Sequence, residues 1–598
     1  MPAKSPIAKS LDLVAVSILV GGKELKEEYQ AISLSVSKTI NKVPTAKIVL
    51  LDGNAADQTF EISESGALDP GKEIEIKAGY DTTVKTIFKG IITDHGISLG
   101  GARRSTLTIR AKDAAVKLTL GRKTLSFEEK KDSEILQTIA KPLVDSVKVE
   151  ATKFKHPKVI QYDSTDWDFI MTRAEINGFV VISDDGALTI GPPVTSGTAS
   201  FIVTQGVDIL EFDANIDSKY QLPDKLVANS WDMKTQKLLT ATAKKPSLNK
   251  WGDLDGGKLS DVIGLKELQT SSSAPIPKEV LQEWSNGRLL KSRLAAMHGK
   301  VTFHGNADVK VGTLLDIAGM GKHFNGTAYI SGIDHQFQNG MWTTTARFGL
   351  DPKWFVETRP EVNTLNTAGL IPAIKGLQTG VVKQIEEDPD GEHRILVDIP
   401  VVEASGKGVW ARLTHLYASK GIGFFFMPEV GDEVVLGFLN DDPRYPIIVG
   451  MMYSSKLAPA ETATKDNFIK SITTKEKMKI TFDEEKKIIT IETPGKNTIV
   501  MDDDKKAITL TDANKNVVAL DDKGISLTTK KDITIDAKGK VTLGGAGGVA
   551  IASKGGNVTM EGISVEAKAK MAFKAEGKMV DVKGTVQANL EGAIVTIN

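Results

Sequence analysis

Apolar and polar residues alternate along most of this 598-residue chain, a pattern typical of β-strands that bury one face. The alternation is most regular over residues 11–120, where runs such as LDLVAVSILV and STLTIRAKDA are separated by Gly, Asp and Pro. It returns in FVVISDDGALTIG and again from KVTFHGNADVKVG onward. We therefore predict a mainly β protein, in which residues 1–355 form a hub region of two related β-barrel units with helical inserts.

Three segments of the hub region show a helical period instead. They are SEILQTIAKPL, STDWDFIMTRAEINGF and PKEVLQEWSNGRLLKSRLAAMHG. In the second segment, Thr165 and Asp168 resemble a capping box, and Gly178 suits the residue after a helix end. The polar segment KKPSLNKWGDLDGGKLSD, residues 244–261, is expected to be an exposed loop.

Two polar linkers divide the rest of the chain. A linker at 356–376 precedes residues 377–455, where about five short strands suit a small Greek-key barrel of the OB type. A second linker at 456–477 leads to the final region, residues 478–598.

The final region is a ladder of short repeats. From Ile508 onward, pairs of the form apolar-x-apolar recur about every eight or nine residues, and Gly-containing turns such as AKGK and SKGG separate many of them. The pairs expected to form its core are Ile525 and Leu527, Ile533 and Ile535, Val541 and Leu543, Val549 and Ile551, and Val558 and Met560.

A single repeat of the ladder is not stable alone. Two buried aliphatic side chains contribute about 3 to 6 kcal/mol, whereas ordering eight residues costs about 8 to 16 kcal/mol of backbone entropy. A single-chain solenoid, several chains wound together, or an up-and-down sheet would each supply the missing contacts, and the period alone does not decide among them. No longer period of about 24 residues, as a three-sided single-chain coil would need, is visible. Three chains that each provide one face of a triangular prism fit better.

Composition limits the function. The 75 Lys and Arg residues nearly balance the 76 Asp and Glu residues, which disfavours nucleic acid as a partner. The absence of Cys excludes disulfides and thiolate chemistry. No window resembles a membrane span, and the apolar run LVAVSILV is short and lacks a cleavage site. We expect a protein made in the cytoplasm without a signal peptide.

Four local motifs have a chemical and a structural interpretation. GDLDGGKL, residues 252–259, resembles a phosphate-binding loop, but Leu259 replaces the Ser or Thr that would bind magnesium, and an exposed turn is the better interpretation. DPDGEHRILVD lacks the Glu of a calcium loop, and we interpret it as a hairpin turn.

The other two motifs also favour structure. His298, His304, His323 and His335 lie in one region, but their spacing matches no metal-ligand pattern. FFFMPEV, residues 424–430, is interpreted as a buried barrel strand and not as a membrane-wedging patch. We expect no catalytic residue, metal site or cofactor.

The chain resembles the VgrG-type spike proteins of contractile injection systems, which are related to phage tail hub and spike proteins. The resemblance is most specific in GVWARLTHLYASKGIGFFFMPEVGDEVVLGFLNDDPRYPIIVGMMYSS, which has a Trp strand, a P-x-x-G-D-E-V strand and a D-P-x-x-P-I-I-V-G strand. The residues that carry this OB motif are Trp410, Pro428, Gly431, Asp432, Glu433, Pro443, Pro446 and Gly450.

The resemblance implies a homotrimer with a C-terminal triple-stranded β-helix needle. It further implies a PAAR-type tip protein at the C-terminal end, with Ile594, Val595 and Ile597 as candidate contacts. Inner tube and baseplate proteins are implied at the N-terminal end, together with a possible effector cargo. The function implied is mechanical and not enzymatic.

Two other functions stay open at this stage. The ladder could be a β-solenoid hydrolase of cell wall or polysaccharide, in which paired carboxylates would line one face. It could also be a glycan-binding adhesin of the tail-fibre kind. The polar positions of the ladder are mostly Thr, Lys, Ala and Gly, which does not favour the hydrolase.

Overall fold

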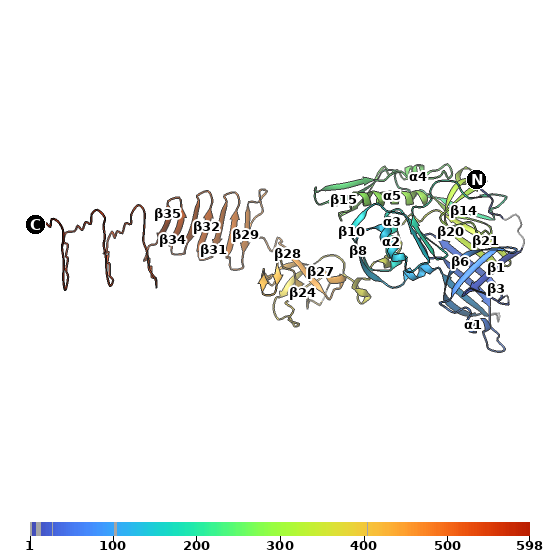
Figure 1. Ribbon diagram of the computed structural model, residues 1–598, viewed down its shortest axis with the longest axis horizontal. Coiled ribbons are helices and arrows are strands. Elements are labelled where there is room, and N and C mark those ends of the chain that lie inside the picture. The colour runs from blue at the N-terminus through green and yellow to red at the C-terminus, as the bar shows by residue number, and fades with distance from the viewer. Residues whose placement is uncertain (1–2, 8–12, 27, 101–104, 403–404, 598) are drawn as a thin grey trace. The chain divides into compact units, whose positions relative to one another are not determined.

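Strands make up most of the regular structure of the chain in the computed structural model (Figure 1). The structure describes residues 3–7, 13–26, 28–100, 105–402 and 405–597. They divide into two compact units, residues 1–452 and 453–598. The prediction of a mainly β protein is confirmed. Among the described residues, the helices are too short or too polar to cross a lipid bilayer.

The largest element of the first unit is a 13-stranded sheet that joins strands from both halves of the hub region. Its two halves meet where β20 pairs antiparallel with β3. Strands from the first half are β1 (Val14–Val20), β2 (Lys23–Glu24), β3 (Ala31–Thr39), β4 (Thr45–Leu51), β5 (Glu73–Tyr80), β6 (Thr83–Leu99) and β7 (Ser105–Lys112). Those from the second half are β13 (Phe201–Thr204), β14 (Glu211–Ile216), β18 (Met297–His304), β19 (Leu314–Ala318), β20 (Gly326–Gln338) and β21 (Met341–Phe348).

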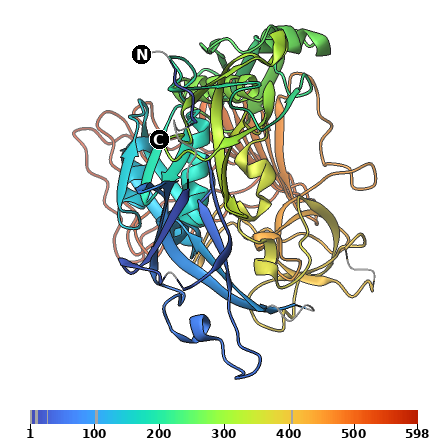
Figure 2. The same ribbon diagram turned by 90° about the vertical axis from the view of Figure 1, so that its right-hand side faces the viewer.

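Each half of this sheet has its own hydrophobic core. The first core includes Ile76 and Phe88, and the second includes Phe303 and Ile330, all of them almost completely buried. Alternation along the strands produces both cores, since every second side chain points to the same face. Two β-units are therefore present, but they share one continuous sheet (Figure 2).

Helices and small sheets are inserted between these strands. The helices of the first unit are α1 (Glu61–Glu64), α2 (Asp132–Ala140), α3 (Asp166–Ile176), α4 (Gly256–Ile263), α5 (Lys278–Leu294), α6 (Gly321–Phe324) and α7 (Phe355–Thr358), with the 3-10 turns η1 (Ala114–Thr119), η2 (Pro360–Val362) and η3 (Asn366–Gly369). The additional strands are β8 (Lys123–Lys131), β9 (Ser146–Val149), β10 (Lys155–Ser164), β11 (Val180–Asp184), β12 (Ala187–Gly191), β15 (Leu226–Asp232), β16 (Lys237–Thr242) and β17 (Leu268–Ser272).

The helix α3 begins and ends as its sequence predicts. The hydroxyl of Thr165 accepts a hydrogen bond from the backbone N–H of Asp168 at 3.1 Å, which satisfies an otherwise unpaired donor of the first turn. Gly178 follows the helix with φ of +69°, a conformation that glycine adopts without strain. Between them, Ile170 and Met171 are buried in a core shared with α2.

Residues 244–261 depart from the exposed loop that we predicted. The last part of this segment forms the start of α4, where the carboxylate of Asp255 accepts from the backbone N–H of Lys258 at 3.0 Å. Leu259 is buried, and Trp251 packs edge-on against Phe348 with ring centroids 4.8 Å apart. The loop prediction was wrong here because a helix of two turns gives too short a periodic signal.

The OB segment forms a closed five-stranded barrel, as predicted. Its strands, in order around the barrel, are β22 (Gln378–Gln384), β23 (Ile395–Asp398), β24 (Val409–Leu413), β28 (Pro446–Met451) and β27 (Glu433–Phe438). The short hairpin β25 (Ala418–Ser419) and β26 (Ile422–Gly423) and the turn η4 (Leu439–Asp441) lie between them in sequence. Val382, Ile395, Val397, Val434 and Leu436 fill the barrel.

The second unit is an up-and-down sheet followed by irregular chain (Figure 1). Seven antiparallel strands pair strictly in sequence order: β29 (Ile469–Thr473), β30 (Lys479–Asp483), β31 (Ile488–Glu492), β32 (Thr498–Asp502), β33 (Ala507–Thr511), β34 (Val517–Asp521) and β35 (Gly524–Thr528). The first strand lies within the range predicted as a linker. From 529 to 597, the described chain has no helix or strand.

Candidate assembly interface

One face of the seven-stranded sheet carries two rows of apolar side chains. The cross-strand register places Ile491 opposite Ile499, and Ile499 opposite Leu510, so that the rows run continuously across the strands. The first row is Ile472, Ile480, Ile491, Ile499, Leu510, Val518 and Leu527. The second row is Phe482, Ile489, Met501, Ile508, Leu520 and Ile525. We call these thirteen residues the apolar face.

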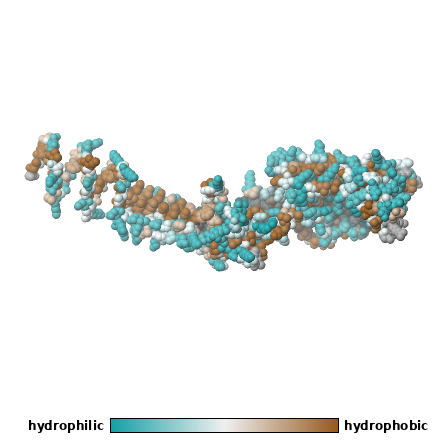
Figure 3. Space-filling model, turned by 90° about the horizontal axis from the view of Figure 1, so that it is seen from below, coloured by the Kyte–Doolittle hydropathy of each residue, from teal (hydrophilic) through white to brown (hydrophobic). Residues whose placement is uncertain are grey.

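The apolar face is uncovered in a single copy. Leu527 is 56% exposed and Ile525 is 76% exposed, and the other members are exposed or only partly buried. Figure 3 shows the apolar residues gathered in a continuous band along this region. Contiguous apolar surface of this kind marks an interaction site in a soluble protein.

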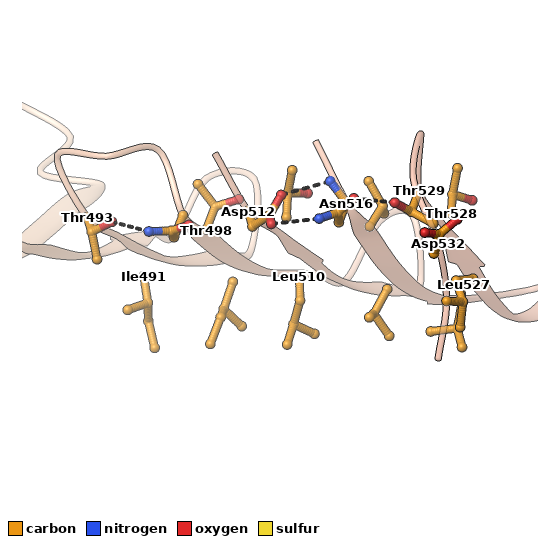
Figure 4. Close-up of a pocket in the computed structure, with 16 residues that line it drawn as sticks. Ile491, Thr493, Thr498, Leu510, Asp512, Asn516, Leu527, Thr528, Thr529 and Asp532 are labelled. Atoms are coloured by element: carbon orange, nitrogen blue, oxygen red, sulfur yellow. Dashed lines mark hydrogen bonds between the residues drawn. The ribbon is translucent and has the colours of Figure 1, made fainter. Parts of the chain in front are cut away.

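The opposite face of the sheet is more polar. Its central row is Ser471, Thr481, Thr490, Val500, Thr509, Ala519 and Ser526. Figure 4 shows Ile491, Leu510 and Leu527 on one side of the strands, with Asp512 and Asn516 hydrogen-bonded to each other on the other side. This two-sided pattern is typical of an antiparallel sheet with one solvated face and one face that is buried against other residues.

Carboxylates organise the turns that join the strands. Asp502 accepts from the backbone N–H of Lys505 at 3.0 Å and from its ammonium at 2.9 Å. These hydrogen bonds lower the pKa of Asp502 below its ordinary value. Asp483 and Lys486 repeat the arrangement two strands earlier. The turns are thus fixed locally, without help from another chain.

One of the predicted core pairs lies in the seven-stranded sheet, and the others lie in the irregular chain that follows it. Ile525 and Leu527 lie on the apolar face in β35. The other pairs lie in the irregular chain, where every one is exposed: Ile533, Ile535, Val541, Leu543, Val549, Ile551, Val558 and Met560. The candidate tip residues Ile594, Val595 and Ile597 are exposed as well. Beyond Ile448, no hydrophobic residue of the described chain is buried in a single copy.

Pattern reasoning missed the part of the apolar face that precedes Ile508. The same alternation is present in KITFD and IITIE, but Ile488 beside Ile489 and Val500 between Ile499 and Met501 place apolar residues on both faces. The sequences at these positions are therefore continuous apolar runs, in which the alternation of a β-strand is not visible.

The OB motif residues lie where the barrel turns and pairs. Trp410 in β24 is paired with Leu396, and Gly450 in β28 with Val435. Gly431 has φ of +96° in the turn before β27, where the Asp432 carboxylate accepts from the backbone N–H of Glu429 at 2.9 Å. The other motif residues are Pro428 before that turn, Glu433 at the start of β27, Pro443 after η4 and Pro446 at the start of β28.

The segment 424–430 is not the buried strand that we predicted. It forms no strand, and Phe425 is 84% exposed, with Phe424 and Phe426 about half exposed. Three consecutive phenylalanines place side chains on both sides of any extended backbone, so only one side could face the barrel interior.

The remaining motifs are occupied by structural contacts. The carboxylate of Asp388 accepts from the backbone of Asp390 and Glu392 and from the Arg394 guanidinium at 2.6 Å, which makes a hairpin turn between β22 and β23. His335 is buried and bonded to Thr344, and its burial lowers its pKa to about 3. The described residues contain no cluster of three or more metal-ligating side chains.

Comparison with known proteins locates two family matches. Residues 10–339 match the Alg8 N-terminal domain, and residues 378–453 match the type VI secretion system/phage-baseplate injector OB domain.

Curated relatives match over shorter segments. The type VI secretion system spike protein VgrG1a of Pseudomonas aeruginosa is 30% identical over 93 residues, which is 14% of each chain. The actin cross-linking toxin VgrG1 of Vibrio cholerae is 30% identical over 134 residues, 21% of this chain and 11% of that protein. The chain therefore covers only a small part of the length of these relatives.

A solved structure is also similar over part of the chain. The 43 kDa tail protein of prophage MuSo2 from Shewanella oneidensis has a TM-score of 0.44 and 13% identity, covering 57% of this chain and 98% of that one. The matched families decide the assignment, since the first spans more than half of the chain. The chain belongs to the Alg8 N-terminal domain family, and its residues 378–453 are similar to the type VI secretion system/phage-baseplate injector OB domain.

Proposed function

We propose that three copies of this chain form the hub and spike of a contractile injection system, joining an inner tube to a membrane-puncturing needle. The hub region would be residues 1–355, the OB domain 377–455 and the needle 478–598, with linkers at 356–376 and 456–477. One observation carries the proposal. The second unit has a seven-stranded sheet with an apolar face that the described residues of its own unit leave uncovered.

Three copies can cover this face around a shared threefold axis. A flat sheet that is apolar on one side needs partners across a shared core, and three such sheets close a triangular prism around an axis. Each thirteen-residue apolar face would then pack against those of both neighbours. Burial of apolar side chains supplies the main stabilising free energy of such an assembly.

The irregular chain after 529 would become ordered in the same assembly. Its regularly spaced pairs, from Ile533 and Ile535 to Val558 and Met560, have no partners in one copy. Among its described residues, the backbone makes a single hydrogen bond to other backbone groups, from Gly548 to Gly545. Strand pairing between copies would satisfy these groups and complete a triple-stranded β-helix.

The role that follows is mechanical. The polar positions of the ladder are mostly Thr, Lys, Ala and Gly, whereas a hydrolase of this kind would place paired carboxylates along one face. The relatives in Pseudomonas aeruginosa are named as spike proteins. The activity named for the relative in Vibrio cholerae belongs to that protein, of which this chain matches 11%.

The partners of the spike follow from its two ends. A PAAR-type tip protein would bind at the C-terminal end through Ile594, Val595 and Ile597, which are exposed. Inner tube and baseplate proteins would bind the hub region, and an effector could travel as cargo. We expect no nucleic acid partner, since Lys and Arg nearly balance Asp and Glu in number.

The test is the oligomeric state of the full chain, measured by analytical ultracentrifugation. We expect the parent chain to be a trimer. We expect the Leu527→Asp trimer to be weaker, so that it still dissociates at protein concentrations at which the parent trimer is intact, because a buried unpaired carboxylate is costly. Ser526→Asp is the matched control, since residue 526 lies on the polar face, and it should assemble as the parent does. A parent chain that stays monomeric at high concentration would contradict the proposal.

A further inference from the structure

The turns of the seven-stranded sheet lie along two edges that carry opposite charge. Because the strands pair in sequence order, successive turns alternate between the edges (Figure 1). We count each turn from the last residue of one strand to the first residue of the next. The acidic edge is residues 483–488, 502–507 and 521–524, and the basic edge is residues 473–479, 492–498 and 511–517.

The net charges of the two edges have opposite signs. The three turns of the acidic edge hold eight carboxylates and five lysines, a net charge of −3. The three turns of the basic edge hold five lysines and three carboxylates, a net charge of +2. The motifs DEEKK and DDDKK occur on the acidic edge, whereas TKEKMK and TPGKN occur on the basic edge.

Charged side chains on both edges are available to a partner. Glu485, Asp504 and Asp522 are exposed on the acidic edge, one in each turn, and make no ion pair with the described residues of their own copy. The same holds for the exposed ammonium groups of the basic edge at Lys477, Lys496 and Lys515. The local turn contacts use other carboxylates, Asp483 and Asp502 among them.

The symmetry of a three-sided assembly decides which edges meet. When three identical sheets close around an axis with their apolar faces inward, each contact is heterologous, so that one edge of a copy faces the opposite edge of the next copy. An acidic edge therefore always faces a basic edge, and the same contact repeats at all three corners.

The positions of the turns also complement each other. On each edge, turns recur every second strand, at a spacing of roughly 10 Å, and the two edges are offset by one strand, roughly 5 Å. In a threefold assembly without axial shift, each turn of one edge lies level with the gap between two turns of its neighbour. The corners can then interlock, with lysines and carboxylates alternating along the axis.

We propose that the acidic edge of one copy docks onto the basic edge of the next copy, and that this contact sets the alignment of the three sheets. The inference rests on the trimer proposed above and adds the identity of the contacting surfaces. Its partner is a second copy of this chain, bound through opposite charge at the corners in addition to the apolar face within.

The test is charge reversal with rescue, in the full chain. One variant carries Glu485→Lys, Asp504→Lys and Asp522→Lys, a second carries Lys477→Glu, Lys496→Glu and Lys515→Glu, and a third combines all six. Each single-edge variant brings like charges together at every corner, and the combined variant restores opposite charges. The control carries Thr490→Lys, Thr509→Lys and Ser526→Lys on the polar face, away from both edges.

The readout is the rate of subunit exchange between labelled and unlabelled trimers in urea. Urea is uncharged, so the ionic strength can be varied independently. We expect exchange about tenfold faster in each single-edge variant, given that exposed ion pairs contribute modestly but occur at three corners. The combined variant should return to the parent rate, and added salt should reduce the difference.

The outcomes separate this inference from the proposed function. If the parent chain is a trimer but the single-edge variants exchange subunits at the rate of the polar-face control, the edge contact is overturned and the trimer proposal stands. Failure of the combined variant to recover would also overturn it. A monomeric parent chain would overturn the proposed function, and the edge contact with it.

Discussion

Asp132 shows how single residues hold the insert of the hub region together. Its carboxylate is almost fully buried and accepts from the Arg173 guanidinium at 2.8 and 2.9 Å and from the Asn177 amide at 2.9 Å. His156 lies 3.1 Å away. Burial alone would raise the pKa of Asp132, but the charge and hydrogen bonds of Arg173 outweigh it, so that the pKa is lowered. The carboxylate is therefore a structural anion that links α2 to α3.

Removing the arginine should destabilise the first unit strongly. We expect Arg173→Met to lower its free energy of unfolding by about 3 kcal/mol, because a buried carboxylate is left without its charge partner. Asp132→Asn combined with Arg173→Met should recover part of the loss. Urea unfolding of the full chain, followed at the transition of the first unit, measures both. Equal losses in the single and double variants would count against the ion pair as the cause.

The same pair gives a pH dependence with a definite sign. The pKa of Asp132 in the folded chain lies below its ordinary value of 3.8, so the folded state favours the ionised form. The stability from this group is present above about pH 4 and is lost as the pH falls through the lower folded value. Arg173→Met should therefore lose less stability than the parent chain when the pH is lowered from 5 to 3. A larger loss in the variant would contradict this assignment.

At the scale of elements, α3 begins as its sequence predicts, and that beginning can be tested. Thr165→Ala removes the hydroxyl that caps the backbone N–H of Asp168 and should cost about 1 kcal/mol. Thr172→Ala in the same helix is the control, because its hydroxyl bonds to Phe169, a carbonyl inside the helix, and its loss should matter little. Thermal or urea unfolding compares the two variants. Equal effects would remove the special role of the cap.

Prediction from sequence succeeded where a local pattern decides the structure. The OB barrel and the strands that hold the pairs from Ile508 to Leu527 follow from alternation, and α3 follows from its cap and its closing Gly178. The pairs from Ile533 onward stay a prediction. Prediction from sequence failed where contacts between segments far apart in the chain determine the structure. The pairing of β20 with β3 joins residues about three hundred positions apart, which no local window contains. The segment 424–430 failed because its apolar run has no period, and α4 because it is too short.

At the scale of the whole molecule, the two units differ in how they satisfy their apolar residues. The first unit has several cores of its own, and its buried hydrophobic residues extend as far as Ile448. The second unit has the strand ladder of a folded sheet, but its apolar face remains uncovered in one copy. In the proposed trimer, contact between copies would supply the core that this ladder lacks, which is why the account depends on that contact.

That contact can be measured directly, because the chain has no cysteine of its own. Leu510→Cys introduces a thiol on the apolar face, and Thr509→Cys introduces one on the polar face of the same strand. Under mild oxidation, the account predicts that Leu510→Cys forms disulfide-linked pairs of chains, with one thiol of each trimer left free, and that Thr509→Cys does not. Efficient cross-linking through residue 509, or none through residue 510, would contradict the claim that the apolar faces of identical copies meet.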